Sequence, residues 1–306
     1  METVLVTGGN GFIGGYVVEE LVRRGYHVSV FDTRWRPTMG GAELVLGDIR
    51  DATAVTEAVA HADGIIHLAG VLGTQETIAN PRPAAETNIL GGLNVLEAAV
   101  QYNIPMVNIA VGNYWMNNTY SITKNTVERF AEMLVRYRGA KVTTVRALNA
   151  YGPRQVAAEP YGPSKVRKVM PSFVCRALSG LDIEVYGDGE QIMDMIFVAD
   201  VANVLVTALE YTAKHGPVQS VLEAGTGRKT TVNDIANTVI TEVANKYEFF
   251  PKLAHLPMRP GEDERSVVLG NPETLKAIGI DSSGFTSLEE GVGQSVAYFA
   301  QYLKAR

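Results

Sequence analysis

The sequence predicts an α/β protein with a doubly wound parallel sheet in its first half and a smaller α+β cap after it. Short apolar runs alternate there with longer amphipathic segments, and strands that alternate with helices imply parallel pairing. The apolar runs are continuous, as expected for parallel strands, which are buried on both faces. A glycine-rich turn at residues 7–14 joins the first run to the first amphipathic segment.

The elements of the first half follow in a regular order. The first strand is expected at 3–6, and the first helix at 11–24 has apolar residues at helical spacing and closes on Gly25. Further strands are expected at 27–31, 43–46, 64–68, 106–110 and 142–146. The helices between them are expected at 52–60, 84–102 and 120–138.

The pattern loosens after Tyr151-Gly152-Pro153, which indicates a second domain. Further helices are expected at 171–179, 201–212, 232–245 and 291–303, and strands at 183–186 and 220–224. We therefore expect a first domain over 1–165, to which segments near 192–226 return. The smaller domain is expected over 166–306.

Composition and charge narrow the classes of function. The net charge of -6 leaves no basic footprint for DNA or RNA. The one cysteine, Cys175, lies in an apolar stretch and is interpreted as a buried hydrophobe, with a nucleophile as the alternative. A lone cysteine, no signal peptide and no membrane-spanning window favour a cytoplasmic protein, and no metal site is indicated.

The glycine turn Thr7-Gly8-Gly9-Asn10-Gly11-Phe12-Ile13-Gly14 predicts a dinucleotide site on a Rossmann sheet. Its glycines allow a sharp turn, close approach of a pyrophosphate and tight helix packing, and the helix start attracts the phosphates. A purely structural turn is the alternative. We expect the cofactor to contact Gly8, Asn10, Gly11, Phe12, Ile13 and Gly14.

An acid at the end of the second strand favours NAD over NADP. Asp32 is placed to bind the ribose hydroxyls, and its charge would repel a 2′-phosphate, although Arg34 and Arg36 lie close by. After the third strand, Asp48 and Ile49 are expected at the adenine; Asp48 is also a candidate cap of the next helix. After the fourth strand, the pyrophosphate is expected beside Leu68, Ala69 and Gly70.

Tyr120 and Lys124 are the candidate catalytic pair. Four residues apart on a predicted helix, they share a face, and a cationic lysine would lower the pKa of the phenol. Such a tyrosine can take a proton from a sugar hydroxyl while hydride leaves the same carbon. The spacing is common by chance, so a plain surface pair is the alternative. Both residues are also expected to bind the cofactor.

These motifs together resemble the extended short-chain dehydrogenase/reductases, in particular the NAD-dependent nucleotide-sugar epimerases and dehydratases. The resemblance runs from Thr3 to about Ile280. Besides the glycine turn and Tyr120-x-x-x-Lys124, it rests on 67–70, on Asn88 with 94–98, and on 146–155, 187–191, 197–201 and 259–262.

The resemblance implies an NAD enzyme in which Tyr120 is the acid/base and Lys124 holds the nicotinamide ribose. The later domain would bind a nucleotide sugar, with a UDP-sugar favoured. Asn149 would touch the phosphates, Val169 would flank the base, and Arg259 would meet the diphosphate, unless it is a solvated loop arginine. A homodimer is implied through a four-helix bundle of the helices at 84–102 and 120–138.

The chain departs from the family after its fifth strand. Where the family has Ser or Thr to bind the sugar hydroxyl, the sequence reads Ala110-Val111-Gly112. Asn113 and Thr119 are the candidate catalytic substitutes, with Ser121 as a further donor; otherwise Tyr120 acts alone at a slower rate. A second departure is Met193, which stands where the family has a diphosphate-binding arginine.

Other residues could offset these losses. Lys165, Arg167 and Lys168 could supply charge, and Tyr114 and Trp115 could stack on a base or sugar, or pack against the cap. The loop before Tyr120 has no carboxylate for dehydration, and the nearest earlier acids are Glu76 and Glu86. A C4-epimerase is therefore the leading hypothesis. A dehydratase or net dehydrogenase/reductase and a non-catalytic NAD sensor are the alternatives.

Overall fold

The computed structural model describes residues 1–37, 39–73, 77–159, 168–247, 249–259, 262–263 and 265–304. The chain forms two compact units. The first comprises Met1–Leu148, Ala199–Ala224 and Asn271–Ser282, and the second comprises Asn149–Val198, Gly225–Gly270 and Ser283–Arg306. The first unit thus ends its main stretch at Leu148 rather than at 165. It also takes back a late segment, 271–282, that the sequence does not indicate.

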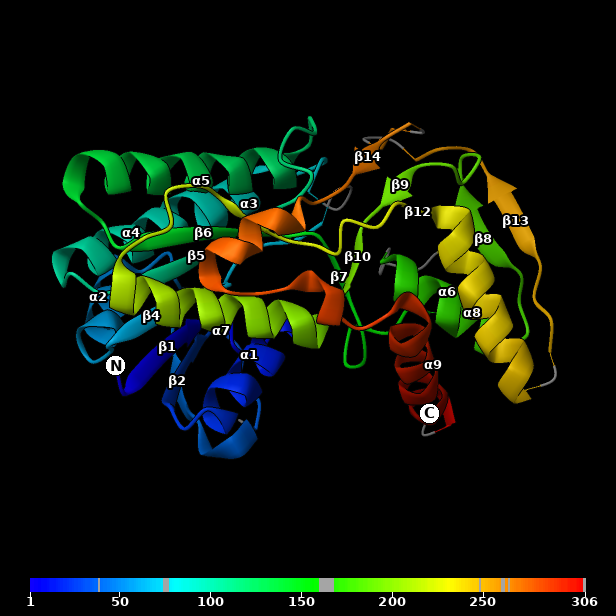
Figure 1. Cartoon of the computed structure of the whole chain (residues 1–306), viewed down its shortest axis with the longest axis horizontal. Coiled ribbons are helices and arrows are strands. Elements are labelled where there is room, and N and C mark those ends of the chain that lie inside the picture. The colour runs from blue at the N-terminus through cyan, green and yellow to red at the C-terminus, as the bar shows by residue number, and fades with distance from the viewer. Residues whose placement is uncertain are drawn as a thin grey trace. The chain divides into compact units, whose positions relative to one another are not determined.

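A seven-stranded sheet forms the centre of the first unit (Figure 1). In space its strands run β11 (Leu222–Ala224), β6 (Val142–Ala147), β5 (Met106–Val111), β4 (Gly64–His67), β1 (Thr3–Thr7), β2 (His27–Asp32) and β3 (Glu43–Leu46). Every pairing is parallel, which confirms the predicted doubly wound sheet. The strand order reverses beside β1, and such a switch point is where ligands bind in these folds.

Helices cover both faces of this sheet. On one face, Leu5, Ile65, Met106 and Val142 stand side by side in register and pack against the helices α2 (Ala52–Ala60), α4 (Gly92–Gln101) and α5 (Thr119–Arg138). The helices α1 (Phe12–Arg23) and α7 (Val198–His215) lie over the other face, where the hydroxyls of Thr143 and Thr212 are 2.6 Å apart.

The predicted helix at 84–102 is not one continuous α-helix. It consists of α3 (Arg82–Ala85), a π-helical turn η2 (Glu86–Gly91) and α4. Gly91 and Gly92 lie at the end of this turn, and a Cβ on Gly91 would come within 2.6 Å of Ile49. The missing side chain of Gly91 therefore lets the segment lie close to the loop after β3. Such π turns are frequent at functional sites.

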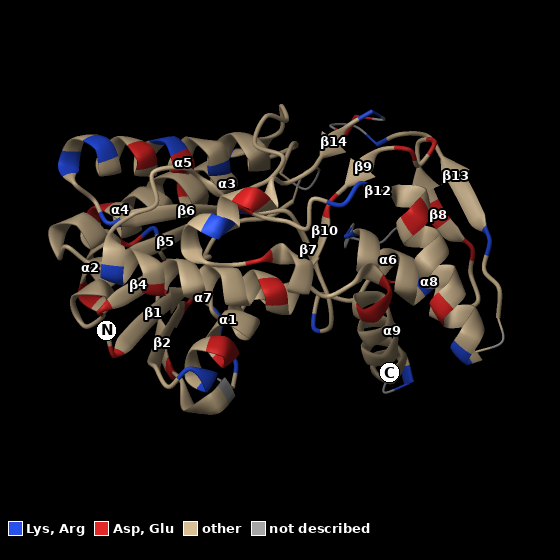
Figure 2. Cartoon of the chain, viewed as in Figure 1, with Lys and Arg blue, Asp and Glu red and all other residues tan. Residues whose placement is uncertain are grey.

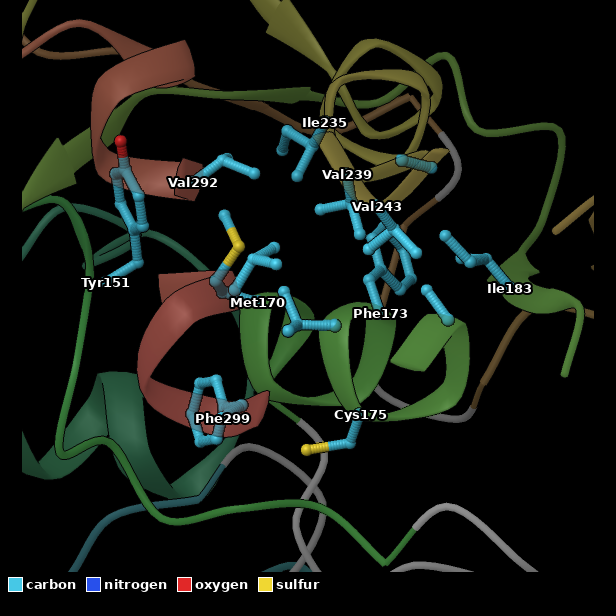
Figure 3. Packing of buried hydrophobic residues seen from close by; sticks show 14 of the residues in the cluster. Tyr151, Met170, Phe173, Cys175, Ile183, Ile235, Val239, Val243, Val292 and Phe299 are labelled. Carbon is cyan, nitrogen blue, oxygen red and sulfur yellow. The ribbon is translucent and has the colours of Figure 1, made fainter. Parts of the chain in front are cut away.

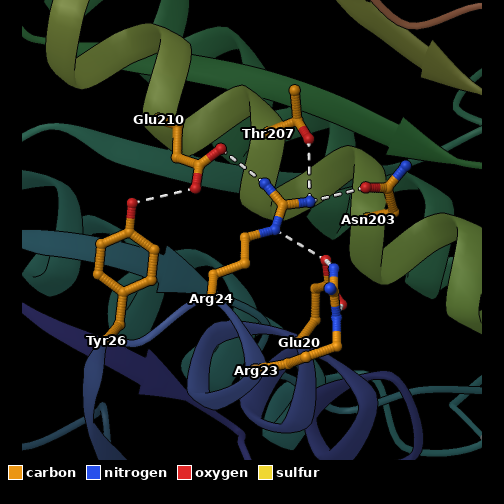
Figure 4. Close-up of polar contacts among 7 residues, drawn as sticks. All are labelled: Glu20, Arg23, Arg24, Tyr26, Asn203, Thr207 and Glu210. Atoms are coloured by element: carbon orange, nitrogen blue, oxygen red, sulfur yellow. Dashed lines mark hydrogen bonds and ion pairs between the residues drawn. The ribbon is translucent and has the colours of Figure 1, made fainter.

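Arg24, just after α1, ties this helix to α7 (Figure 4). Its guanidinium donates to Glu20, Glu210 and Asn203 at 2.6–2.7 Å, and the Tyr26 hydroxyl donates to Glu210 as well. Hydrogen bonds to charged groups are worth roughly 1.5–3 kcal/mol each, less where solvent reaches them. The network fixes the helix whose first turn borders the glycine loop.

The second unit has its own hydrophobic core between α6 (Val169–Leu178), α8 (Val232–Tyr247) and α9 (Leu288–Lys304), as Figure 3 shows. Cys175 is fully buried in it, as predicted. The short strands are β7 (Asn149–Tyr151), β8 (Ile183–Tyr186), β9 (Ile192–Met193), β10 (Met195–Phe197), β12 (Thr230–Thr231), β13 (Leu253–Leu256) and β14 (Val267–Val268). The buried Asp194 carboxylate accepts bonds from Thr226, Gly227 and Gly270, which joins the loops around them.

The remaining short helical turns are η1 (Met39–Gly41), η3 (Pro272–Ile278) and η4 (Ser282–Gly284). Basic and acidic side chains are interspersed along α5 rather than gathered by sign (Figure 2). In the described part of the chain, none of the helices combines the length and the apolar content that crossing a membrane would require.

Candidate functional site

The glycine turn after β1 has the backbone geometry that its sequence predicts. Gly8 has a φ of 73°, and a Cβ there would lie 2.7 Å from the backbone nitrogen of Ala69. A Cβ on Gly14 would lie 2.3 Å from the carbonyl oxygen of Gly8. Larger residues at either position would therefore push the turn away from β4 or away from α1.

The first turn of α1 presents hydrogen-bond donors that have no acceptor within the helix itself. Gly11 is the N-cap and offers no side chain, and the first turn contains no acidic residue. The amides of Phe12, Ile13 and Gly14 have no partner within the helix, because such partners begin only at the fourth position. An anion placed there would meet three N–H groups and the positive end of the helix dipole.

These elements border a pocket of about 700 Å³ that lies wholly in the first unit. Its lining brings together most residues predicted from the sequence: Gly8, Gly11, Phe12, Ile13, Gly14, Asp32, Asp48, Ile49, Leu68, Ala69, Gly70, Tyr120 and Lys124. It also contains residues that the sequence analysis missed, among them Thr33, Arg50, Val71, Leu72, Thr87, Ile109, Ala147 and Leu148. Arg34, which the sequence suggests only as a positive charge that could counter Asp32, also lines the pocket.

Asp32 holds the glycine turn as well as facing the pocket. Its carboxylate accepts the backbone N–H of Asn10 at 3.1 Å and that of Arg34 at 3.0 Å. The Asn10 side chain donates to the Arg34 carbonyl and is not part of the pocket lining. Asn10 thus joins two loops, and the structure does not bring it to the predicted cofactor surface.

Asp48 is ion-paired at the same end of the pocket. The Arg50 guanidinium donates to both of its carboxylate oxygens, at 2.6–3.1 Å, and these bonds hold the pKa of Asp48 below its usual value. Asp51, not Asp48, caps α2, because its carboxylate accepts the N–H groups of Thr53 and Ala54. The helix-cap alternative for Asp48 is therefore wrong.

Asn88 fixes the loop after β4. Its side-chain oxygen accepts the N–H of Val71 at 2.7 Å, and its amide nitrogen donates to the Val71 carbonyl and to the Thr123 hydroxyl on α5. Thr87 precedes it and lines the pocket with a half-buried side chain. Helical threonines such as Thr126 and Thr212 bond to their own helix backbone. No such bond engages the Thr87 hydroxyl among the described residues.

Tyr120 and Lys124 both line the pocket, on the first turns of α5. Burial raises the pKa of Tyr120 to about 12 and lowers the pKa of Lys124 to about 8. The expectation that Lys124 lowers the tyrosine pKa is therefore wrong for the protein alone. Removing the phenol from water outweighs the neighbouring cation.

The candidate substitutes for the missing hydroxyl lie outside the lining of this pocket. Neither Asn113 nor Thr119 lines the pocket. The Thr119 hydroxyl donates to the Thr77 carbonyl at 3.1 Å, and the Asn113 amide contacts the Met116 sulfur. Ser121 is fully buried and outside the lining. Thr33, Thr87 and Tyr120 are the hydroxyl side chains of the described pocket lining.

The predicted substrate residues lie in the second unit. The Asn149 side chain donates to the Asp194 carbonyl at 3.2 Å, and Val169 begins α6 and packs on its core. Arg259 is ion-paired to Glu262 and stacks on the Tyr186 ring at 4.4 Å. It is therefore not a solvated loop arginine.

The structure describes some of the other residues that the sequence singles out, and others lie outside the described residues. Met193 lies on β9, paired with β12 and β14. Lys168 is the N-cap residue of α6. Lys165, Arg167 and Glu76 lie outside the described residues.

Comparisons with known proteins agree with this geometry. A model of the NAD dependent epimerase/dehydratase family matches residues 4–112 and 108–221. A putative UDP-glucose 4-epimerase of Methanocaldococcus jannaschii is 28% identical over 268 residues, which cover 80% of this chain and 84% of the relative.

Two solved structures are similar over almost the whole chain. The UDP-glucose 4-epimerase of Thermotoga maritima, solved with UDP-glucose, is 30% identical with a TM-score of 0.83, covering 98% of this chain and 99% of its own. That of Thermus thermophilus, in complex with NAD, is 29% identical with a TM-score of 0.81, covering 97% of this chain and 98% of its own.

Proposed function

Because the chain belongs to the NAD-dependent epimerase/dehydratase family, enzymes of the extended short-chain dehydrogenase/reductase type, we propose that it is a 4-epimerase of a UDP-sugar. One observation carries the proposal: Tyr120 and Lys124 share a pocket with the glycine turn and Asp32. The UDP-glucose 4-epimerases among the similar proteins support the substrate class.

The pocket residues fit an extended dinucleotide. The first turn of α1 would hold the pyrophosphate, the Asp32 carboxylate would accept the adenosine ribose hydroxyls, and Ile49 would pack on the adenine. Lys124 and Thr87 would hold the second ribose as donors. NAD, when bound, would supply a hydride acceptor and a positively charged ring in the pocket that Tyr120 lines.

Tyr120 would move the proton at the sugar C4 hydroxyl. With a pKa raised to about 12 by burial, its phenol is protonated at neutral pH and is ready to donate. Accepting a proton requires added positive charge nearby, and Lys124 supplies part of it on the same helix face. Inversion at C4 would follow when the hydride returns to the opposite face of the 4-keto group, and the same tyrosine would give the proton back to O4.

The loop 112–118 favours epimerisation over dehydration. Elimination of water needs an acid and a base beside the leaving hydroxyl. The loop reads Gly-Asn-Tyr-Trp-Met-Asn-Asn and contains no carboxylate. We assign the nucleotide sugar to Asn149, Val169 and Arg259 of the second unit by resemblance, with Asn113 and Thr119 as secondary catalytic candidates.

We also propose a homodimer formed through α4 and α5. The neighbouring segments η2 and α5 expose the apolar side chains Leu90, Ile122 and Met133, each between 39% and 57% accessible. Exposed apolar side chains on two packed helices favour burial against a second copy.

The test is to purify the protein, measure its bound NAD, and assay UDP-glucose and UDP-galactose interconversion. We expect turnover by the wild type and a loss of at least about a thousandfold in Tyr120→Phe, with NAD still bound. Bound NAD without turnover of any nucleotide sugar would favour the sensor hypothesis. Accumulation of a 4-keto-6-deoxy product would favour the dehydratase.

A further inference from the structure

Tyr114, in the loop 112–118, stacks on an arginine of the sheet. The guanidinium carbon of Arg146 lies 3.6 Å from the centre of the Tyr114 ring. Arg146 belongs to β6 and its side chain is 14% exposed, whereas Tyr114 is 37% exposed. The arginine side of this cation–π contact is therefore desolvated, which strengthens the contact. The guanidinium occupies one face of the Tyr114 ring and ties the loop to the sheet.

The same guanidinium is bound to the helix of the candidate catalytic pair. Arg146 Nε donates to Oε2 of Glu128 at 3.0 Å, and its terminal nitrogen makes a second bond to the other oxygen. Glu128 lies on α5, one turn after Lys124 and two turns after Tyr120, and it is buried. A bidentate pair of this kind fixes orientation as well as distance.

Because of this ion pair, Glu128 is paired with Arg146 and not with Lys124. Lys124 and Glu128 are four residues apart on one helix face, a spacing at which they could pair with each other. Arg146 takes the carboxylate instead, and Glu223 on β11 lies 3.3 Å from its remaining nitrogen. Among the described residues, no carboxylate is then paired with Lys124, which lines the pocket.

The stack lies next to residues of the pocket wall. Arg146 is the register partner of Ala110, and both Ala110 and the adjoining Ala147 line the pocket. Only seven residues, 112–118, connect β5 to α5. In so short a connection, the place where the loop is held sets where the first turn of α5 begins.

We infer that Tyr114 is a positioning residue for Tyr120 and Lys124, which it orients through its stack on Arg146 and the Arg146–Glu128 ion pair. The catalytic role of Tyr120 and Lys124 rests on the proposed function. The Tyr114–Arg146 stack does not depend on that function, so the stack and the function can be tested separately.

The test compares Tyr114→Phe, which keeps the ring, with Tyr114→Ala and Tyr114→Leu, which remove it. In a Trp35→Phe background, Trp115 is the one tryptophan, half exposed and next to Tyr114 in the loop. Acrylamide quenching of its fluorescence reports the order of the loop. Tyr137→Ala is the matched control, because Tyr137 stacks on Arg136 at the far end of α5.

We expect Tyr114→Ala and Tyr114→Leu to lower kcat about 10- to 100-fold, since small misplacements of catalytic groups have costs of this size, with KM within about threefold. Quenching of Trp115 should rise in both. Tyr114→Phe should match the wild type, as should Tyr137→Ala. Arg146→Lys keeps a charge for Glu128 but loses the planar face, so it should resemble Tyr114→Ala and add little to it.

The inference is overturned if Tyr114→Ala keeps the wild-type kcat, if Tyr114→Phe is equally damaged, or if the loss lies in KM alone. If the wild type turns over no nucleotide sugar, the proposed function fails, but the quenching comparison still decides the stack. Should Tyr114→Ala not fold, Tyr114→Leu and Arg146→Lys carry the same comparison.

Discussion

The hydroxyl of Thr7 lies 2.7 Å from Nδ1 of His67, across the paired strands β1 and β4. The same oxygen lies 3.3 Å from the N–H groups of Leu68 and Ala69, which donate to it. The contact joins the ends of the two strands, and which of the two groups donates in it depends on the tautomer of the neutral ring. Burial, together with the charge on Lys124, lowers the pKa of His67 to about 3.

This pKa predicts an acid-sensitive fold. Between pH 6.5 and 3 the unfolded chain binds a proton at His67 and the folded chain does not, so stability falls as the pH falls. The slope from this group approaches about 1.4 kcal/mol per pH unit. Urea unfolding at pH 7 and pH 5 should show a smaller decrease for His67→Gln than for the wild type. Equal decreases in the two proteins would contradict the assignment.

Binding of NAD should weaken at alkaline pH. Burial lowers the pKa of Lys124 to about 8, so its ammonium is present below that pH and is lost as the pH rises through it. A charged hydrogen bond to the ribose would be lost with it, at a cost of roughly 1.5–3 kcal/mol. Calorimetric titration of the NAD-free protein from pH 6.5 to 9.5 tests this. Lys124→Met should bind weakly at every pH; a decline that persisted in this variant would assign it to another group.

Thr87 should contribute through its hydroxyl. Thr87→Ser keeps the hydroxyl, whereas Thr87→Val keeps the shape and removes it. We expect Thr87→Val to lose about tenfold or more in kcat/KM or in NAD affinity, and Thr87→Ser to stay within about threefold. The pair of variants separates hydrogen bonding from packing. If valine is tolerated as well as serine, the hydroxyl has no role in the pocket.

Asp32 should decide between NAD and NADP. Asp32→Asn removes the charge that would repel a 2′-phosphate and leaves the Arg34 guanidinium, now 3.5 Å from the carboxylate, without its partner. We expect NAD affinity to fall about 10- to 100-fold and NADP affinity to rise. Because general damage would weaken both cofactors, the ratio of the two dissociation constants is the measurement. An unchanged ratio would contradict the assignment of Asp32 as the residue that selects NAD over NADP.

The proposed dimer can be tested with one charge. Ile122 is 49% exposed on α5, and Ile122→Glu would place a carboxylate in the apolar contact between two copies. Light scattering after gel filtration should report a dimer for the wild type and a monomer for this variant. Ile122→Leu is the control and should remain dimeric. A monomeric wild type would exclude the dimer at the concentration used.

The fold of the first unit could be predicted because its signals are local. Continuous apolar runs indicate parallel strands, and three spaced glycines indicate the dinucleotide turn after β1. The π turn at Glu86–Gly91 was beyond such reasoning, because close packing of Gly91 on Ile49 is a tertiary contact. The late return of 271–282 to the first unit likewise depends on contacts such as that of Asn271 with Glu223.

The candidate site was predicted where one residue type implies one role, as for Gly8, Asp32 and Lys124. It was missed where partners are distant in sequence. Nothing near Tyr114 indicates that Arg146, 32 positions later, would take its ring face. The sequence predicts the wrong direction for the pKa of Tyr120, because it contains the neighbouring charge of Lys124 but not the degree of burial of the phenol.

The composition of the first unit from three separate stretches, Met1–Leu148, Ala199–Ala224 and Asn271–Ser282, bears on how the protein is made. A nascent chain that has emerged only to Leu148 lacks β11, one edge strand of the sheet, and α7, which covers one of its faces. The Arg24 network and the Glu223 contact of Arg146 can close only when most of the chain has left the ribosome. Synthesis should therefore leave this face covered by α1 but not by α7 for several seconds, and assistance by chaperones would act during that interval.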